Sequence, residues 1–259
     1  MSTDADTRFE ISHRGGVSEP SLHKAIEKVT AVADRCREAI HHVELRLVAD
    51  GRAGRSRPVL AEATLTTKRK PVRAHVAAST VDEAVDLLVD RLKRRLERHE
   101  DRLRHQHDRS QGSVSAAMLA SENDRPEFVD LPSDYREIVR SKSFSDGSMT
   151  IEEALFDIEQ LDHSFYLFSS IEAGCDCVLE RTSSGYLLRV IDPDQYGGGP
   201  MPPTVEMSEA VAPTLGLEEA REFLDSTGAD RVFHRDPGDG RGQVLYRRYD
   251  GHYGLVTLD

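Results

Sequence analysis

The densest group of side chains that could do chemistry is a run of arginines within residues 79–106. The run recurs at intervals of three and four residues and comprises Arg91, Arg94, Arg95, Arg98 and Arg102. Such spacing is typical of one side of an α-helix. Guanidinium groups held at nearly fixed spacing on a rigid helix suit the binding of phosphates. We predict that these arginines form a stripe opposite the leucines of the same helix.

A second basic group lies in the preceding stretch "TKRKPVR". It contains Lys68, Arg69, Lys70 and Arg73. We expect it where the chain turns back toward the arginine-rich helix, so that loop and helix together form a candidate RNA-binding surface. The alternative is an ordinary solvated helix face, because acidic residues of the same helix could pair with its arginines. The spacing leaves both interpretations open.

Other combinations of reactive side chains predict no active site. The histidines of "HEDRLRHQH" lack the spacing of a zinc motif and lie on an arginine-rich helix that would repel a cation. Cys175 and Cys177 are predicted on opposite faces of a strand, where they could not share a metal. "YGGGP" lacks the Lys and Ser or Thr of a phosphate-binding loop. We therefore predict a protein that is not an enzyme, with no catalytic residues, no metal and no cofactor.

The composition favours several small modules over one large core. The chain has 259 residues, is 38% hydrophobic and contains no Trp. Its polar beginning lacks the apolar segment of a signal peptide, and no apolar run approaches the ~20 residues of a membrane span. Its three cysteines give no pattern of paired disulfides. These features predict a soluble, cytoplasmic protein.

The charge is divided unevenly along the chain. Residues 1–109 hold 22 Lys and Arg against 18 Asp and Glu, a balance of +4. Residues 110–259 hold 12 against 28, a balance of −16. The first part is therefore compatible with a nucleic-acid partner, although the whole chain is acidic.

Residues 1–109 read as one small α+β domain. A short strand at 9–11 precedes a helix at 18–39, whose apolar residues recur at helical spacing. Three strand candidates follow in "HHVELRLVAD", "RPVLAEATLTTKRK" and "VRAHVAAS", and the helix at 79–106 completes the order β-α-β-β-β-α. Both helices are expected on one face of the sheet.

The remainder of the chain contains a module written twice. Residues 110–135 read as a linker, 136–194 as the first copy, 195–203 as a Gly/Pro hinge and 204–259 as the second copy. At a constant offset of 66 residues, "VLERTSSGYLLRV" in the first copy is echoed by "VLYRRYDGHYGLV" in the second. The predicted fold class is α+β, with the N-terminal domain followed by two tandem β-α-β-β-β modules.

These motifs resemble those of the long-form bacterial ribosome hibernation promoting factors. The helix "AVDLLVDRLKRRLERHEDRLR" resembles the second helix of that family's N-terminal domain. "IVRSKSF", "EEA" and "LDHSFYLF" occur in the order and spacing of its C-terminal domain, and "VLYRRYDGHYGLV" is similar to its closing hairpin. The resemblance covers most of residues 8–259.

The resemblance implies a protein that binds the decoding channel of the small ribosomal subunit against 16S rRNA. It would block tRNA and mRNA, inhibit translation and protect idle ribosomes during stress. By position, Arg91, Arg94 and Arg98, together with residues 68–70, are then expected to contact RNA phosphates, whereas Lys24 and Lys28 are weaker candidates. The family's C-terminal domain forms homodimers that join two 70S ribosomes into a 100S pair.

This chain departs from the family pattern because it carries two C-terminal copies, which have diverged. "FYLF" at 165–168 is replaced by "RVFH" at 231–234. A tethered copy has an effective concentration around millimolar, so we expect the copies to pair within one chain rather than as a homodimer. The protein would then hold single 70S ribosomes.

Three further readings of the chain remain open. The acidic modules could touch a basic ribosomal protein, or nothing. The chain could be a stress-induced general RNA-binding protein, or an acidic adaptor that recruits a protein partner. No membrane partner is predicted.

Overall fold

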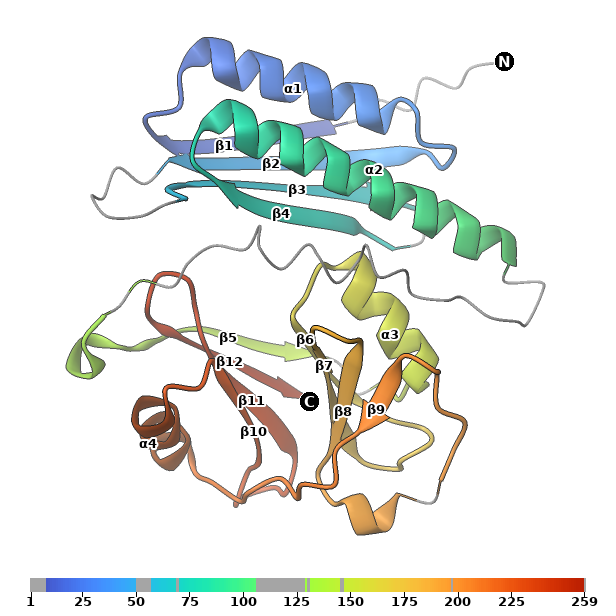
Figure 1. The fold of residues 1–259 in the computed structure, drawn as a ribbon, viewed down its shortest axis with the longest axis vertical. Helices are drawn as coiled ribbons and strands as arrows, with labels where there is room; N and C mark the ends of the chain where they lie inside the picture. The colour runs from blue at the N-terminus through green and yellow to red at the C-terminus, as the bar shows by residue number, and fades with distance from the viewer. Residues whose placement is uncertain are drawn as a thin grey trace. The chain divides into compact units, whose positions relative to one another are not determined.

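A computed structural model describes residues 8–49, 57–68, 70–105, 129, 131–144, 147–196 and 198–258. The chain divides into two compact units, drawn in Figure 1. Met1–Gly112 forms most of the first unit, and Phe128–Ile158 with His163–Asp259 forms most of the second. Of the helices described, none is both long and apolar enough to cross a membrane.

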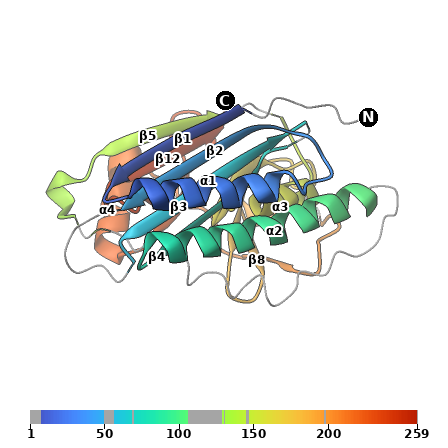
Figure 2. The ribbon, with the colours of Figure 1, turned by 90° about the horizontal axis from the view of Figure 1, so that it is seen from above.

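The first unit is a four-stranded sheet covered on one face by two helices. Its elements, in chain order, are β1 (Arg8–Gly15), α1 (Glu19–Ala33), β2 (Ile40–Ala49), β3 (Val59–Thr67), β4 (Val72–Ala78) and α2 (Val81–His105). The strands lie in the order β1-β2-β3-β4, with β1 parallel to β2 and the other pairs antiparallel. Figure 2 shows α1 and α2 side by side over the sheet. The predicted β-α-β-β-β-α order is confirmed.

Alternating side chains explain why this sheet has one covered and one open face. Val43, Leu45 and Leu47 of β2 are buried against the helices, and the residues between them face the other way. On α2, Leu88 and Leu92 are fully buried in the same core. The polar residues of the strands are therefore collected on the open face.

The second unit contains the two copies of the repeated module. The first copy consists of β5 (Ile138–Phe144), α3 (Ile151–Gln160), β6 (Phe165–Ser169), β7 (Asp176–Arg181) and β8 (Tyr186–Val190). The second consists of β9 (Val205–Met207), α4 (Leu217–Thr227), β10 (Arg231–Arg235), β11 (Gly242–Arg247) and β12 (Tyr253–Leu258). Short 3-10 turns lie at Ser133–Tyr135 and Pro193–Gln195. The helices and the two strands after each of them begin 66 residues apart, the offset found in the sequence.

The two copies exchange their first strands. One sheet has the order β6-β7-β8-β9 and the other β10-β11-β12-β5. Strand β5 of the first copy therefore lies parallel to β12 of the second, and β9 of the second lies parallel to β8 of the first. The element order of each module is as predicted, but neither copy completes its own four-stranded sheet.

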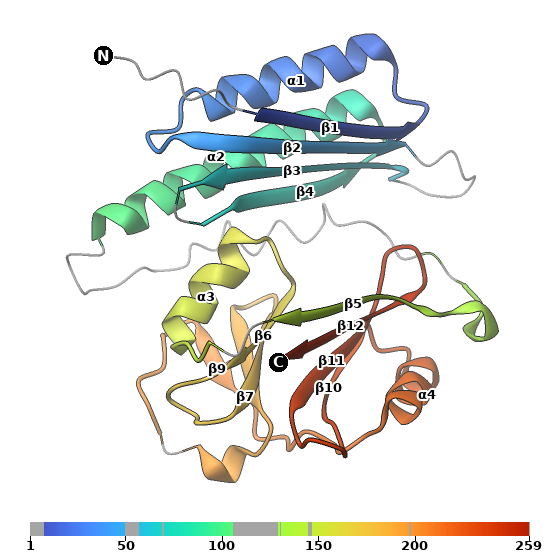
Figure 3. The same ribbon diagram turned by 180° about the vertical axis from the view of Figure 1, so that it is seen from behind.

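The second unit has four layers, in the order helix, sheet, sheet, helix. Helix α3 packs on one sheet through Ile151 and Ile158, and α4 packs on the other through Ala220 and Leu224. A third apolar cluster joins the inner faces of the two sheets. It comprises Leu167, Val178, Ile191, Ala212, Phe233, Val244, Val256 and Leu258. Figures 1 and 3 show α3 and α4 on opposite outer sides of the paired sheets.

The prediction that Cys175 and Cys177 lie on opposite faces is wrong. Both side chains pack against the core beneath α3, because the extended chain that leads into β7 at Cys175 turns residues two apart to the same face. A hydrogen bond from the Cys177 thiol lowers the pKa of Cys175 to about 7. The same interaction and burial raise the pKa of Cys177.

Candidate nucleic-acid interface

Arg91 and Arg95 of α2 lie beside its leucines rather than opposite them. Arg91 and Arg95 are only 4% and 6% exposed, so the predicted solvent-facing stripe is wrong at these two positions. Arg91 is three residues and Arg95 seven residues after Leu88, and both spacings return to the same side of a helix. Arg94 is exposed, and its Nε donates a hydrogen bond of 3.2 Å to the carbonyl oxygen of Asp90.

Acidic residues in the first turns of α2 form ion pairs with lysines of α1. Lys24 of α1 lies 3.0 Å from the carboxylate of Asp82, and Lys28 pairs with Asp86. The two pairs repeat at an interval of four residues on both helices, which brings the side of α2 that bears Asp82 and Asp86 against α1. Lys24 and Lys28 remain 49% and 33% exposed, but each has a neighbouring negative charge.

The turn between β3 and β4 presents lysines to solvent. Lys68 and Lys70 are both exposed. The hydroxyl of Thr67 donates a hydrogen bond of 2.9 Å to the carbonyl oxygen of Lys70 and accepts one from its N–H, and these bonds fix the turn. Arg69 lies outside the described residues. Arg102 belongs to α2, but its side chain lies outside them as well.

Arg73 belongs to the open face of the sheet and not to the helix side. Its neighbours Val72 and Ala74 are buried beneath the helices, so alternation turns Arg73 away from α2. There it forms an ion pair with Glu62 of β3. The structure therefore separates the predicted cations into a helix side and a sheet side.

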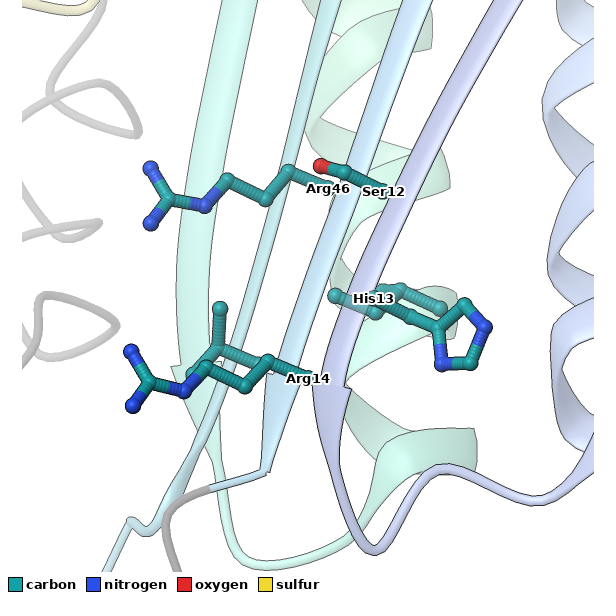
Figure 4. Close-up of a pocket in the computed structure, with 6 residues that line it drawn as sticks. Ser12, His13, Arg14 and Arg46 are labelled. Atoms are coloured by element: carbon teal, nitrogen blue, oxygen red, sulfur yellow. The ribbon is translucent and has the colours of Figure 1, made fainter.

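Two arginines that the sequence analysis did not select lie on the open face. Arg14 of β1 and Arg46 of β2 line a hollow of about 330 Å³, together with Ser12 and Val48. Figure 4 shows both guanidinium groups extending to the same side of the sheet, whereas His13 points the other way. The signal was present in the sequence, because burial of Leu45 and Leu47 forces Arg46 onto the opposite face.

The open face also holds the one group of potential metal ligands found among the described residues. His42 Nε2 lies 3.6 Å from a carboxylate oxygen of Glu10 and 3.9 Å from one of Glu44. Both carboxylates are exposed, and an exposed group of this kind is common without a metal.

The N-terminal unit thus has the architecture of a small α+β domain with exposed cations on two sides. Arg94, Lys68 and Lys70 lie on the helix side and at its adjoining turn, whereas Arg14 and Arg46 lie on the sheet side. Exposed Arg and Lys on rigid elements are typical of domains that bind nucleic-acid phosphates.

Comparison with protein families identifies both parts of the chain. The model of the sigma 54 modulation protein/S30EA ribosomal protein family matches residues 9–104. The model of the C terminus of sigma 54 modulation/S30EA ribosomal proteins matches twice, at residues 133–186 and 201–255. The chain therefore belongs to the sigma 54 modulation/S30EA ribosomal protein family, with the C-terminal domain present twice.

Curated relatives match over part of their length. The chain is 34% identical over 121 residues to proteins named "Dormancy associated translation inhibitor" from two strains of Mycobacterium tuberculosis, CDC 1551/Oshkosh and ATCC 25618/H37Rv. The match covers 40% of this chain, and the chain spans 41% of the length of these relatives.

Solved structures that match are small and distant in sequence. The N-terminal domain of Protein Y from Thermus thermophilus is 17% identical, and a ribosomal subunit interface protein from Coxiella burnetii is 18% identical. Each match covers 36% of this chain and 98% of the solved chain, with a TM-score of 0.30.

Proposed function

We propose that this protein is a ribosome hibernation factor that binds the small-subunit decoding channel, inhibits translation and keeps idle ribosomes as 70S monosomes. The observation that carries the proposal is the presence of the family's N-terminal domain followed by two C-terminal domains in one chain. The names of similar proteins, "Dormancy associated translation inhibitor" and "ribosomal subunit interface protein", agree with this function.

In this proposal, the helix side of the N-terminal unit contacts 16S rRNA phosphates. Arg94, Lys68 and Lys70 are the exposed members of the predicted set, and Arg98 is half-buried beside them. Arg69 and Arg102 remain candidates from their sequence positions alone. Lys24 and Lys28 contribute less, because neighbouring aspartates offset their charge.

The remaining predicted cations are either buried or lie on the sheet side of the unit. Arg91 and Arg95 are buried and form ion pairs with Asp162, which offset their charge within the fold. Arg73, with Arg14 and Arg46, belongs to the sheet side. These three would contact RNA only if the rRNA also reaches the open face.

The acidic C-terminal unit supplies the second part of the proposal. Each copy completes the sheet of the other and shares an apolar cluster with it, which supports pairing within one chain. A surface that is occupied by the tethered copy is not available to a second ribosome-bound chain. The negative charge of this unit favours a basic ribosomal protein over RNA as any further partner.

Ribosome co-sedimentation tests the proposed rRNA contact. The charge reversals Arg94→Glu and Arg98→Glu together should weaken binding to 70S ribosomes by about tenfold or more at low salt, and the difference from wild type should shrink as salt is raised. Arg140→Glu, at an exposed position of β5 in the acidic unit, is the matched control and should bind as the wild type does. Unchanged binding by the α2 variant would refute the assignment.

A parallel measurement separates the helix side from the sheet side. Arg14→Glu with Arg46→Glu should leave binding nearly unchanged if only the helix side contacts rRNA. Equal affinity of the wild-type protein for isolated RNA and for assembled 30S subunits would instead favour a general RNA-binding protein.

A further inference from the structure

The two copies present different side chains to each other at equivalent positions. With the 66-residue offset, Phe165 corresponds to Arg231, Asp176 to Gly242, and Cys175 to Arg241. Asp176 meets Gly242, and Phe165 meets Arg231, so equivalent positions face one another across the contact. The backbones of the two copies therefore pair at equivalent positions, whereas the side chains at those positions differ in chemistry.

The first asymmetric contact holds a buried carboxylate. Asp176, 5% exposed, accepts a 2.8 Å hydrogen bond from Arg241 Nε and another of 2.8 Å from the N–H of Gly242. The hydroxyl of Ser169 donates a third, of 2.7 Å. Burial alone would raise the pKa of Asp176, but these donors outweigh it and lower the pKa.

Two first copies could not reproduce this contact. An aspartate would then replace Gly242, where a Cβ atom would lie 2.8 Å from Cβ of Asp176. Cys175 would stand in place of Arg241. The pair would bury two opposed carboxylates without a guanidinium group, which is strongly unfavourable.

The second asymmetric contact involves an aromatic ring. The guanidinium group of Arg231 lies 5.3 Å from the ring centroid of Phe165, and its Nη1 donates a hydrogen bond of 3.1 Å to the carbonyl oxygen of Ser164. The ring of Tyr246 packs against the same Phe165 at 5.2 Å. Two second copies would place one Arg231 opposite another, with repulsion in place of the cation–π contact.

The apolar cluster between the two sheets does not distinguish a like pair of copies from an unlike pair. Leu167 corresponds to Phe233 and Val178 to Val244, so either copy presents aliphatic or aromatic side chains there. Apolar surfaces of this kind tolerate many partners, and selectivity requires contacts that penalise the wrong one.

We infer that Asp176 and Phe165 of the first copy and Arg241 and Arg231 of the second form a recognition code that favours unlike copies and rejects like ones. The inference rests on the proposed pairing within one chain and adds the residues that enforce it. Tethering disfavours pairing with the unlike copy of a second chain, and the code rejects pairing with its like copy.

Charge reversal at the first contact tests the code in the full-length chain. Asp176→Arg would face Arg241, and Arg241→Asp would face Asp176, so each single variant should lose about 10 °C of thermal midpoint in the C-terminal unit and form no dimer by itself. The double variant in one chain should be a monomer with its midpoint restored. Arg248→Asp, which breaks an ion pair with Asp250 inside the β11–β12 turn, is the control for an Arg-to-Asp change that leaves the code intact.

Mixing the two single variants provides the most direct test of the code. After joint unfolding in urea and refolding, the first copy of each variant is complementary to the second copy of the other. We expect a one-to-one complex of two chains in sedimentation velocity, whereas each variant alone stays below that mass. Phe165→Arg and Arg231→Phe, combined in the same way, repeat the test at the aromatic contact.

Three results would overturn the code. The first is dimers formed by each single variant alone as readily as by the mixture, and the second is a double variant no more stable than the singles. The third is the absence of a complex in both mixtures. A wild-type dimer would refute the proposed pairing within one chain. Selective association of the mixture would in that case still support the code, so the two failures are distinguishable.

Discussion

The first unit completes its sheet with strands from one continuous stretch of chain, whereas each sheet of the second unit takes its fourth strand from the other copy. The sheet of the first unit therefore takes no strand from the C-terminal copies, and its cations are carried by elements that share one core. Each C-terminal copy depends on its neighbour for both a strand and an apolar face. The contrast teaches that the sheet of the first unit is complete without the C-terminal copies, whereas each sheet of the second unit is complete only when both copies are present.

We expect the largest loss of stability when a charged residue is placed on the buried face of an exchanged strand. Ile138 of β5 packs in the core beneath α4, and Val205 of β9 packs in the core beneath α3. Ile138→Asp should destabilise the second copy, and Val205→Asp the first, each by about 3 kcal/mol. Hydrogen exchange should show the loss of protection in the copy that did not receive the mutation. Loss confined to the mutated copy would contradict the exchange.

A smaller loss of stability is expected when the hydroxyl of Tyr253 is removed. Tyr253 of β12 donates a hydrogen bond to Asp225 of α4, and Arg136, which precedes β5, pairs with the same carboxylate. Tyr253→Phe removes one donor, while Arg136 still satisfies Asp225, so the free energy of unfolding should fall by about 1–1.5 kcal/mol. Urea denaturation measures the change. A loss above about 3 kcal/mol would show that the hydroxyl does more than bond to Asp225.

The pH dependence of stability tests the ion pair between Asp176 and Arg241. The pKa of Asp176 is lowered in the folded state, so its contribution to stability is complete above its unfolded pKa of about 4 and is lost as the pH falls below that value. Asp176→Asn should lower the stability of the C-terminal unit at pH 7, and the difference from wild type should narrow toward pH 3. A difference that stays constant with pH would contradict the ion pair with Arg241.

Removing the aspartates beside α1 should give the smallest effect. Asp82→Asn with Asp86→Asn frees Lys24 and Lys28 and should change stability by less than about 1 kcal/mol, because exposed ion pairs contribute little. If the two lysines contact rRNA, ribosome affinity should rise by about two- to threefold at low salt. Weaker binding would exclude them from the interface.

Local patterns predicted the elements of both units but not the partners of the exchanged strands. Alternation and helical periodicity located β2 and α2, and the constant offset located the matched elements of the two copies. A strand such as β5 has the same pattern whichever sheet it completes, so the exchange could not be read from the sequence. The position of Arg95 could have been read, because its spacing from Leu88 already places both on one side of the helix.

The sequence predicted several residues of the candidate site, but it predicted less well which face of the unit each of them lies on. Lys68, Lys70 and Arg94 are exposed as expected, whereas Arg73 faces the opposite side of the sheet. Arg14 and Arg46 were missed because they are isolated in the sequence and are brought together only by the parallel register of β1 and β2. Grouping of this kind depends on strand pairing, which no short motif encodes.

Sucrose-gradient sedimentation of ribosomes with the full-length protein tests the central claim most directly. If the acidic unit is paired within the chain, the protein should co-sediment with 70S monosomes and leave the 100S region empty, even when protein is in excess over ribosomes. A robust 100S peak that contains the protein would contradict the account.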